Sequence, residues 1–79
     1  MKLIKLQMNK TNLAIYGAGY AGLHIFEELV HSDDINIICF VDDNQDLRSK
    51  KIRNTEILHP NQFDLKLISL EIDELIISI

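Results

Sequence analysis

Three glycines with a fixed spacing are the residues best suited to binding chemistry in this chain of 79 residues. They lie in a stretch of the form G-x-G-x-x-G, made of Gly17, Ala18, Gly19, Tyr20, Ala21 and Gly22. In this pattern the first glycine makes a tight turn, the second lets backbone approach a pyrophosphate, and the third lets a helix pack closely on a strand. The helix that follows directs free N–H groups and its positive dipole end at the phosphates. All six residues are therefore predicted to contact a dinucleotide, and the missing Gly-Lys-Ser/Thr argues against a P-loop triphosphatase.

An acidic pair, Asp42 and Asp43, follows the glycines. An acid about 20 residues after such a motif accepts hydrogen bonds from the adenosine ribose. Asp42 lies slightly further on, which the added turn at residues 32–34 explains. Its charge would repel a 2′-phosphate, so NAD is favoured, while three basic residues keep NADP or another nucleotide open: Arg48, Lys50 and Lys51. The alternative is that both acids merely cap a loop.

The other reactive side chains are not expected to form a metal-binding or catalytic site. Four of them share a polar helix face that we interpret as solvated rather than as a metal site: His24, Glu27, Glu28 and His31. Cys39 lies in an apolar run and is expected to be inert core. His59 precedes Pro60 and is expected to cap a helix or lie in a loop. Neither tyrosine beside the glycines has a lysine four residues later, and no nucleophile–base pair is recognisable.

The elements that would position the glycines alternate between strand and helix. Apolar runs predict buried strands at residues 13–16, 35–41 and 75–79, with a weaker strand at 55–58. Helical spacing covers residues 20–31, and a second helix begins at Pro60 and keeps its spacing to Leu70. Residues 47–51 are expected to form a loop or one helical turn. The pattern predicts an α/β fold, a partial Rossmann-like parallel sheet of about four strands with two main helices and right-handed crossovers.

The domain organisation follows from length and from the last strand. We expect a lead-in at residues 1–10 and one Rossmann-like half domain at 11–79, because so short a domain buries only about 60% of its unfolded surface. Parallel strands are normally covered on both faces, and nothing remains to cover residues 75–79. The chain is therefore expected to be a fragment of a longer domain, or to pair with another copy through the sheet edge.

Composition excludes several classes of partner. The formal net charge of −4 gives no reason to expect nucleic-acid binding. The single cysteine fits a reducing cytoplasm. No apolar run reaches the ~18 residues of a membrane span, so this segment is not expected to contact a membrane.

Three blocks of the chain resemble the nucleotide-binding domain of CapD-type polysaccharide biosynthesis proteins. Residues 14–22 read AIYGAGYAG, residues 38–44 read ICFVDDN, and residues 72–79 read IDELIISI. The resemblance implies a bacterial parent with a nucleotide-sugar dehydratase or epimerase domain, often anchored at the cytoplasmic face of the inner membrane. It carries over Gly17, Gly19, Gly22 and Asp42 as binding positions and no catalytic residue. The chain departs from the family where glycines precede the third strand, having instead Lys51, Asn54 and His59.

The sequence thus predicts a domain that binds NAD(H) and does not catalyse alone. One alternative is the nucleotide-sugar-binding domain of a sugar acetyltransferase, although Tyr20 and Ala21 replace the Gly-His pair usual there. Another is the nucleotide-sensing domain of an ion channel or transporter, which acts by switching conformation on binding.

Overall fold

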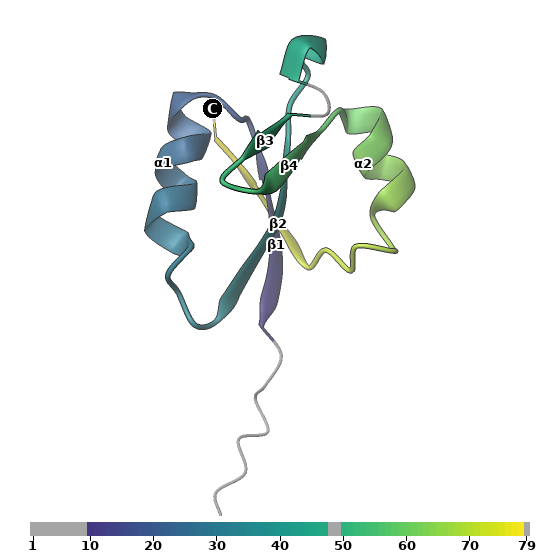
Figure 1. Ribbon diagram of the computed structural model, residues 1–79. Coiled ribbons are helices and arrows are strands. Elements are labelled where there is room, and N and C mark those ends of the chain that lie inside the picture. The colour runs from purple at the N-terminus through teal and green to yellow at the C-terminus, as the bar shows by residue number, and fades with distance from the viewer. Residues whose placement is uncertain (1–9, 48–49, 79) are drawn as a thin grey trace, which may run out of the picture.

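A mostly parallel sheet lies between two helices in the computed structural model, which describes residues 10–47 and 50–78 (Figure 1). The sheet order is β3-β4-β2-β1-β5. The parallel strands are β1 (Thr11–Tyr16), β2 (Ile35–Val41), β4 (Thr55–Leu58) and β5 (Glu74–Ile77). The short β3 (Lys51–Ile52) runs antiparallel to β4. Helix α1 (Tyr20–Leu29) covers one face of the sheet and α2 (Pro60–Lys66) covers the other, while a 3-10 turn, η1 (Gln45–Leu47), follows β2.

The core has two sides because side chains alternate along each strand. On the α2 side the buried cluster consists of Ala14, Cys39, Val41, Leu58 and Phe63. On the α1 side it consists of Ile15, Phe26, Phe40 and Ile57. The rings of Phe26 and Phe40 stack with centroids 5.5 Å apart, which fixes α1 against β2. Burying each such side chain contributes roughly 1.5–3 kcal/mol.

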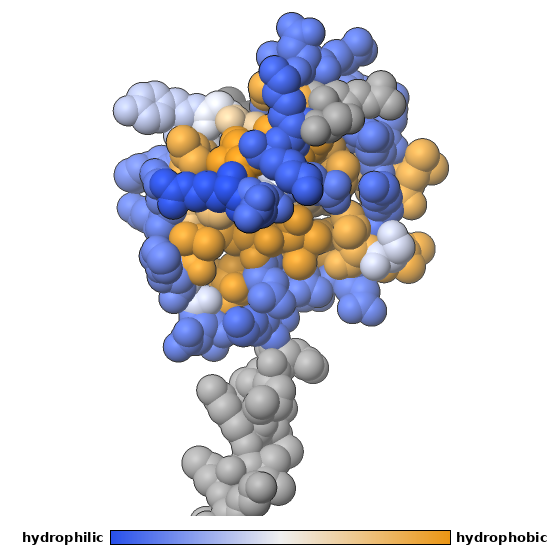
Figure 2. Space-filling model, in the orientation of Figure 1, coloured by the Kyte–Doolittle hydropathy of each residue, from blue (hydrophilic) through white to orange (hydrophobic). Residues whose placement is uncertain are grey.

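The predicted α/β fold, with its partial parallel sheet, is confirmed, and every predicted strand and helix is present. The four polar residues predicted on one helix face are all exposed: His24, Glu27 and Glu28 on α1, and His31, which lies in the turn after α1 because the helix ends at Leu29 and not at residue 31. Figure 2 shows apolar side chains as a band across this view of the molecule, with polar side chains above and below it.

The prediction of a loop or helical turn at residues 47–51 is wrong in part. Lys51 belongs to β3, which forms a hairpin with β4, while Arg48 lies outside the described residues. Arg53 and Asn54 make the hairpin turn with φ values of 48° and 66°, the left-handed conformation that a two-residue hairpin turn needs. Asn54 tolerates this conformation where the resembling family has glycine. The Arg53 guanidinium pairs with the Glu27 carboxylate and so ties the hairpin to α1.

Helix α2 is shorter than its spacing predicts. It ends at Lys66, and residues 67–71 continue as hydrogen-bonded turns until Glu71, whose φ of 54° terminates the helical path. Leu70 and Ile72 still pack against the core, which explains their apolar spacing. At the chain ends, most of the predicted lead-in and Ile79 lie outside the described residues. Within the described ranges, no helix has the length and apolar character to cross a membrane.

Candidate functional site

The glycine turn lies at the carboxyl edge of the sheet, between β1 and α1. Strand β1 sits between β2 and β5, so the chain leaves β1 toward one side of the sheet and returns on the other side through β5. Ligands of open α/β sheets bind outside the carboxyl ends of the strands at such a reversal. The topology therefore places the predicted glycine motif at the position best suited to hold a ligand.

Two of the three glycines are required by the fold itself. Gly17 has a φ of 110°, and a Cβ there would lie 2.3 Å from the Ser78 Oγ. A Cβ on Gly22 would lie 1.7 Å from the carbonyl oxygen of Gly17, closer than any atoms pack. The tight turn and the close packing of helix on strand, both expected from the sequence, are thus present at these positions.

Gly19 differs from the other two glycines because the fold does not require it. A Cβ built there meets nothing within 4 Å, and its φ of −81° is accessible to any residue. Gly19 is the N-cap of α1, and no side chain hydrogen-bonds to the first turn, which also contains no acidic residue. The first intrahelical bond runs from the Leu23 N–H to the Gly19 carbonyl at 3.0 Å. The N–H groups of Tyr20, Ala21 and Gly22 precede this first bond, so the helix itself does not use them.

Asp42 lies directly beneath the glycine turn. Its Oδ2 accepts a hydrogen bond from the Ala18 N–H at 2.8 Å, and its Oδ1 accepts one from the Asn44 N–H at 2.9 Å. The second of these bonds is the loop-capping role considered as an alternative for this residue. A carboxylate offers about four acceptor sites, so two bonds leave capacity for further donors. Asp42 therefore holds the turn in place and retains acceptor sites.

Asp43 is engaged by the last residue of β1. The Tyr16 hydroxyl donates to the Asp43 Oδ1 at 2.5 Å. This hydrogen bond, with some burial and the negative charge of Asp43, raises the pKa of Tyr16 above its ordinary value of 10.0. The structure thus gives Asp43 a partner within the protein, and its contact with a ligand stays a prediction.

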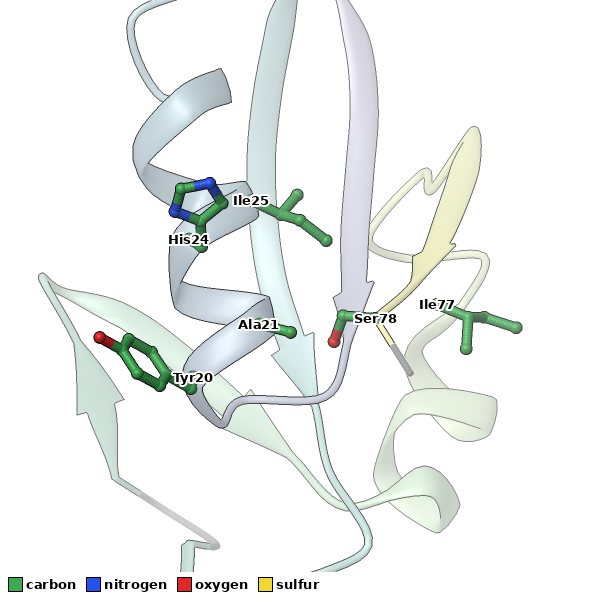
Figure 3. A pocket seen from close by; sticks show the side chains of 6 residues that line it. All are labelled: Tyr20, Ala21, His24, Ile25, Ile77 and Ser78. Atoms are coloured by element: carbon green, nitrogen blue, oxygen red, sulfur yellow. The ribbon is translucent and has the colours of Figure 1, made fainter.

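An open groove of 610 Å³ adjoins the glycine turn between α1 and the end of β5 (Figure 3). Its lining consists of Tyr20, Ala21, His24, Ile25, Ile77 and Ser78. In Figure 3 the Tyr20 ring projects outward from the start of α1, and the Ser78 side chain lies beside the turn. The groove therefore lies beside the position where the strand order reverses, between β1 and its neighbour β5.

Ser78 is a site residue that the sequence analysis missed. Its Oγ donates to the Tyr16 carbonyl oxygen at 2.8 Å, and its backbone N–H donates to the same oxygen at 2.9 Å. These bonds connect the ends of β1 and β5 beneath the glycine turn. The available signal was its place as the first polar residue after an apolar strand.

Of the remaining reactive residues, His59 and Cys39 lie apart from this site, whereas His24 lines the groove. His59 caps α2, since its Nδ1 accepts from the Asn61 N–H at 3.3 Å while its own N–H donates to the Gln62 side chain at 3.0 Å. Cys39 is fully buried, and burial raises the pKa of its thiol to about 11, which keeps it protonated and inert. His24 contacts Glu28 at 3.2 Å on the exposed face of α1. Among the described residues, no three His, Cys, Asp or Glu side chains gather as a metal site would need.

Comparison with known proteins identifies a family and a set of similar structures. The family model described as the N-terminal domain of C2185-like proteins matches residues 9–79. The crystal structure of UDP-D-quinovosamine 4-dehydrogenase from Vibrio fischeri is similar over 86% of this chain, with 25% identity and a TM-score of 0.80. The structure of RSP, a Rex-family repressor, is similar over 92% of this chain, with 26% identity and a TM-score of 0.81. The structure of RSP in complex with β-NADH is similar over 90%, with 26% identity and a TM-score of 0.78.

The matched regions are only part of these proteins. The chain spans 56% of the dehydrogenase and 35% of each RSP structure. No curated protein sequence matches the chain. The similarities support the Rossmann-like fold and do not single out the CapD-type family.

Proposed function

This chain belongs to the C2185-like N-terminal domain family, and we propose that it binds a nicotinamide dinucleotide at its glycine turn. The observation that carries the proposal is the contrast among the glycines. Gly17 and Gly22 are required by packing, whereas Gly19 faces open space beside an uncapped helix N-terminus. A glycine that the fold does not need, at the place where backbone would approach a pyrophosphate, is accounted for by a ligand.

The residues around the turn fit such a ligand. The free N–H groups at the start of α1 suit the negative charge of a pyrophosphate. We propose that the ligand contacts the turn from Gly17 to Gly22, and that Asp42 and Asp43 lie toward the adenosine ribose. The spare acceptor sites of Asp42 suit the ribose hydroxyls, and its charge disfavours a 2′-phosphate, so NAD(H) is preferred to NADP(H). The similarity to RSP, solved in complex with β-NADH, supports this ligand class.

We further propose that residues 11–79 form the binding module of a longer enzyme that acts on nucleotide sugars. The similarity to a UDP-sugar dehydrogenase, of which this chain matches about half, supports that class. A CapD-type dehydratase or epimerase of bacterial surface polysaccharide synthesis is the specific form that the three sequence blocks favour. The chain supplies binding and orientation, and the bound cofactor would accept and return hydride. A reducing cytoplasm suits its single buried cysteine.

A second candidate is a regulatory domain that senses the dinucleotide. The similarity to a Rex-family repressor, over 92% of this chain, favours it. Both candidates share the same ligand and differ in what the rest of the protein does with it. A nucleotide-sugar enzyme would additionally contact a UDP-sugar, whereas a sensor would bind the dinucleotide alone.

Calorimetric titration tests the proposed ligand. The folded chain is titrated with NAD⁺, NADH, NADP⁺ and a UDP-hexose, and NAD(H) is expected to bind at least about tenfold more tightly than NADP⁺. Gly19→Val places a side chain in the open space and is expected to abolish binding without unfolding. Asn61→Ala, at the start of α2, is the matched control and should bind as the original chain does. Failure of the folded chain to bind any of the four ligands, or normal binding by Gly19→Val, would refute the proposal.

A further inference from the structure

Another cavity lies between the β3–β4 hairpin and α2, at the edge of the sheet opposite β5 (Figure 1). Its volume is 310 Å³, which suits a small molecule, since ligand pockets typically measure about 300–1,000 Å³. The lining residues all come from positions 51 to 66: Lys51, Glu56, Ile57, Leu58, Gln62 and Lys66. The hairpin and α2 alone therefore form this cavity, which is separate from the glycine turn and from β5.

The hairpin contributes side chains of both charges to one face of the sheet. Lys51 lies opposite Glu56 in the antiparallel β3–β4 register, and directly opposite side chains lie on the same face. Glu56 is two residues before Leu58, which packs in the α2-side cluster, so Glu56 lies on that side as well. Lys51 and Glu56 therefore both lie on the face toward α2.

Helix α2 adds two more polar side chains to the cavity. Gln62 and Lys66 are four residues apart, so they lie on the same face of the helix. The Gln62 Oε1 accepts from the His59 N–H, which leaves the side-chain NH₂ group as a donor. Lys66 is the only lysine or arginine between residues 54 and 79. The helix thus brings an amide donor and a further ammonium group to the same cavity as the lysine of β3.

The two lysines of the cavity are not neutralised by neighbouring carboxylates. Within residues 10–47 and 50–78, neither Lys51 nor Lys66 forms an ion pair, whereas Arg53 of the same hairpin pairs with Glu27. The chain as a whole has a formal net charge of −4, so two ammonium groups at one cavity are a local excess of positive charge. Such a cavity attracts an anion.

We propose that this cavity binds a phosphorylated sugar through its phosphate group. A phosphate monoester carries a charge of about −1.5 to −2 and three terminal oxygens, which suit two ammonium groups and one amide donor. The Glu56 carboxylate accepts hydrogen bonds, so it suits sugar hydroxyls and would repel a second phosphate. The small volume favours a single sugar over a nucleotide. The inference does not depend on the proposed dinucleotide site.

Titration at constant ionic strength, followed through backbone amide chemical shifts, tests this site. Glucose 1-phosphate is expected to shift the amides of Lys51, Gln62 and Lys66, and to bind at least about tenfold more tightly than inorganic phosphate. Unphosphorylated glucose is expected to cause no shifts at these amides. The absence of saturable shifts with glucose 1-phosphate, or equal affinity for inorganic phosphate, would overturn the proposal.

Two lysine variants with the same change in charge separate this site from general electrostatic attraction of anions. Lys66→Gln is expected to weaken glucose 1-phosphate binding at least about tenfold. Lys50→Gln is the matched control, because Lys50 is exposed and does not line the cavity, and it should bind as the original chain does. Gly19→Val should also bind the sugar phosphate normally, which separates this site from the dinucleotide site. Equal affinity of the two lysine variants overturns the proposal, and so does loss of sugar-phosphate binding in Gly19→Val.

Discussion

Two strand–helix turns lie at the same carboxyl edge of the sheet, and they differ in whether side chains cap the N-terminus of the helix that follows. At β4–α2, His59 and Gln62 form a reciprocal cap and Pro60 occupies the first turn, so the protein satisfies its own N–H groups. At β1–α1, the N-cap is Gly19, and no side chain caps the helix. A protein that closes one helix start so fully has the means to close the other. The turn at α1 is therefore the uncapped one of the two, which is why we propose it as the ligand site.

The three glycines of the uncapped turn between β1 and α1 also differ from one another in how closely they are packed. Gly17 and Gly22 bring α1 against β1 and β5 and would be needed with or without a ligand. Gly19 serves no packing purpose in the described structure. The turn thus contains two glycines that allow the helix to pack closely and one, Gly19, that leaves the N-terminus of α1 accessible.

The largest effect is expected from Gly22→Ala. The new Cβ would overlap the Gly17 carbonyl, so the helix must move away from the strand, and the free energy of unfolding should fall by at least ~3 kcal/mol. Gly19→Ala is the matched control, since its Cβ meets nothing, and should cost less than about 1 kcal/mol. Urea denaturation of both variants measures the difference. Equal losses at the two positions would remove the distinction between structural and accessible glycines.

A smaller effect is expected at the capped turn between β4 and α2. Gln62→Ala removes the side chain that accepts from the His59 N–H and should lower the free energy of unfolding by ~1 kcal/mol. Dinucleotide affinity should not change, because α2 does not contribute to the proposed site. Denaturation and titration of this variant together provide the check. Weaker dinucleotide binding in a folded Gln62→Ala variant would contradict the proposal, because part of the ligand site would then lie at the β4–α2 turn.

The smallest effect concerns the acids beneath the uncapped turn. Asp43→Ala should lower the pKa of Tyr16 toward its ordinary value, because the hydrogen bond and the nearby charge are removed. Since the native pKa is raised above 10.0, the Tyr16–Asp43 pair contributes stability below pH 10 and loses it as the pH rises through the native pKa. Phenolate absorbance measures the titration in a Tyr20→Phe background, where Tyr16 is the remaining tyrosine. An unchanged Tyr16 pKa in Asp43→Ala would show that other causes dominate.

The parts of the candidate site that depend on local sequence patterns were predictable. The G-x-G-x-x-G spacing located the turn, and the apolar runs located the parallel strands around it. The cap at His59 was also predictable, because a residue before proline at a helix start is a local signal.

Long-range and strained features were not predictable. Ser78 contacts Gly17 of the glycine turn across a separation of 61 residues, and only the fold reveals that contact. The β3–β4 hairpin depends on Arg53 adopting a left-handed conformation that arginine rarely adopts, and its ion pair with Glu27 of α1 accompanies that turn. The motif already assigned a separate role to each of the three glycines, and the structure adds that a Cβ would clash at Gly17 and Gly22 but meet nothing at Gly19.

Backbone amide chemical shifts during an NADH titration test the central contrast most directly. A ligand at the uncapped turn is expected to shift the amides of Gly19, Tyr20, Ala21 and Gly22 at the start of α1. The amides of Asn61, Gln62 and Phe63 at the start of α2 should move little, because His59 and Gln62 already satisfy that turn. Shifts concentrated at α2, or no shifts at α1 under saturating NADH, would contradict the assignment of the uncapped turn as the ligand site.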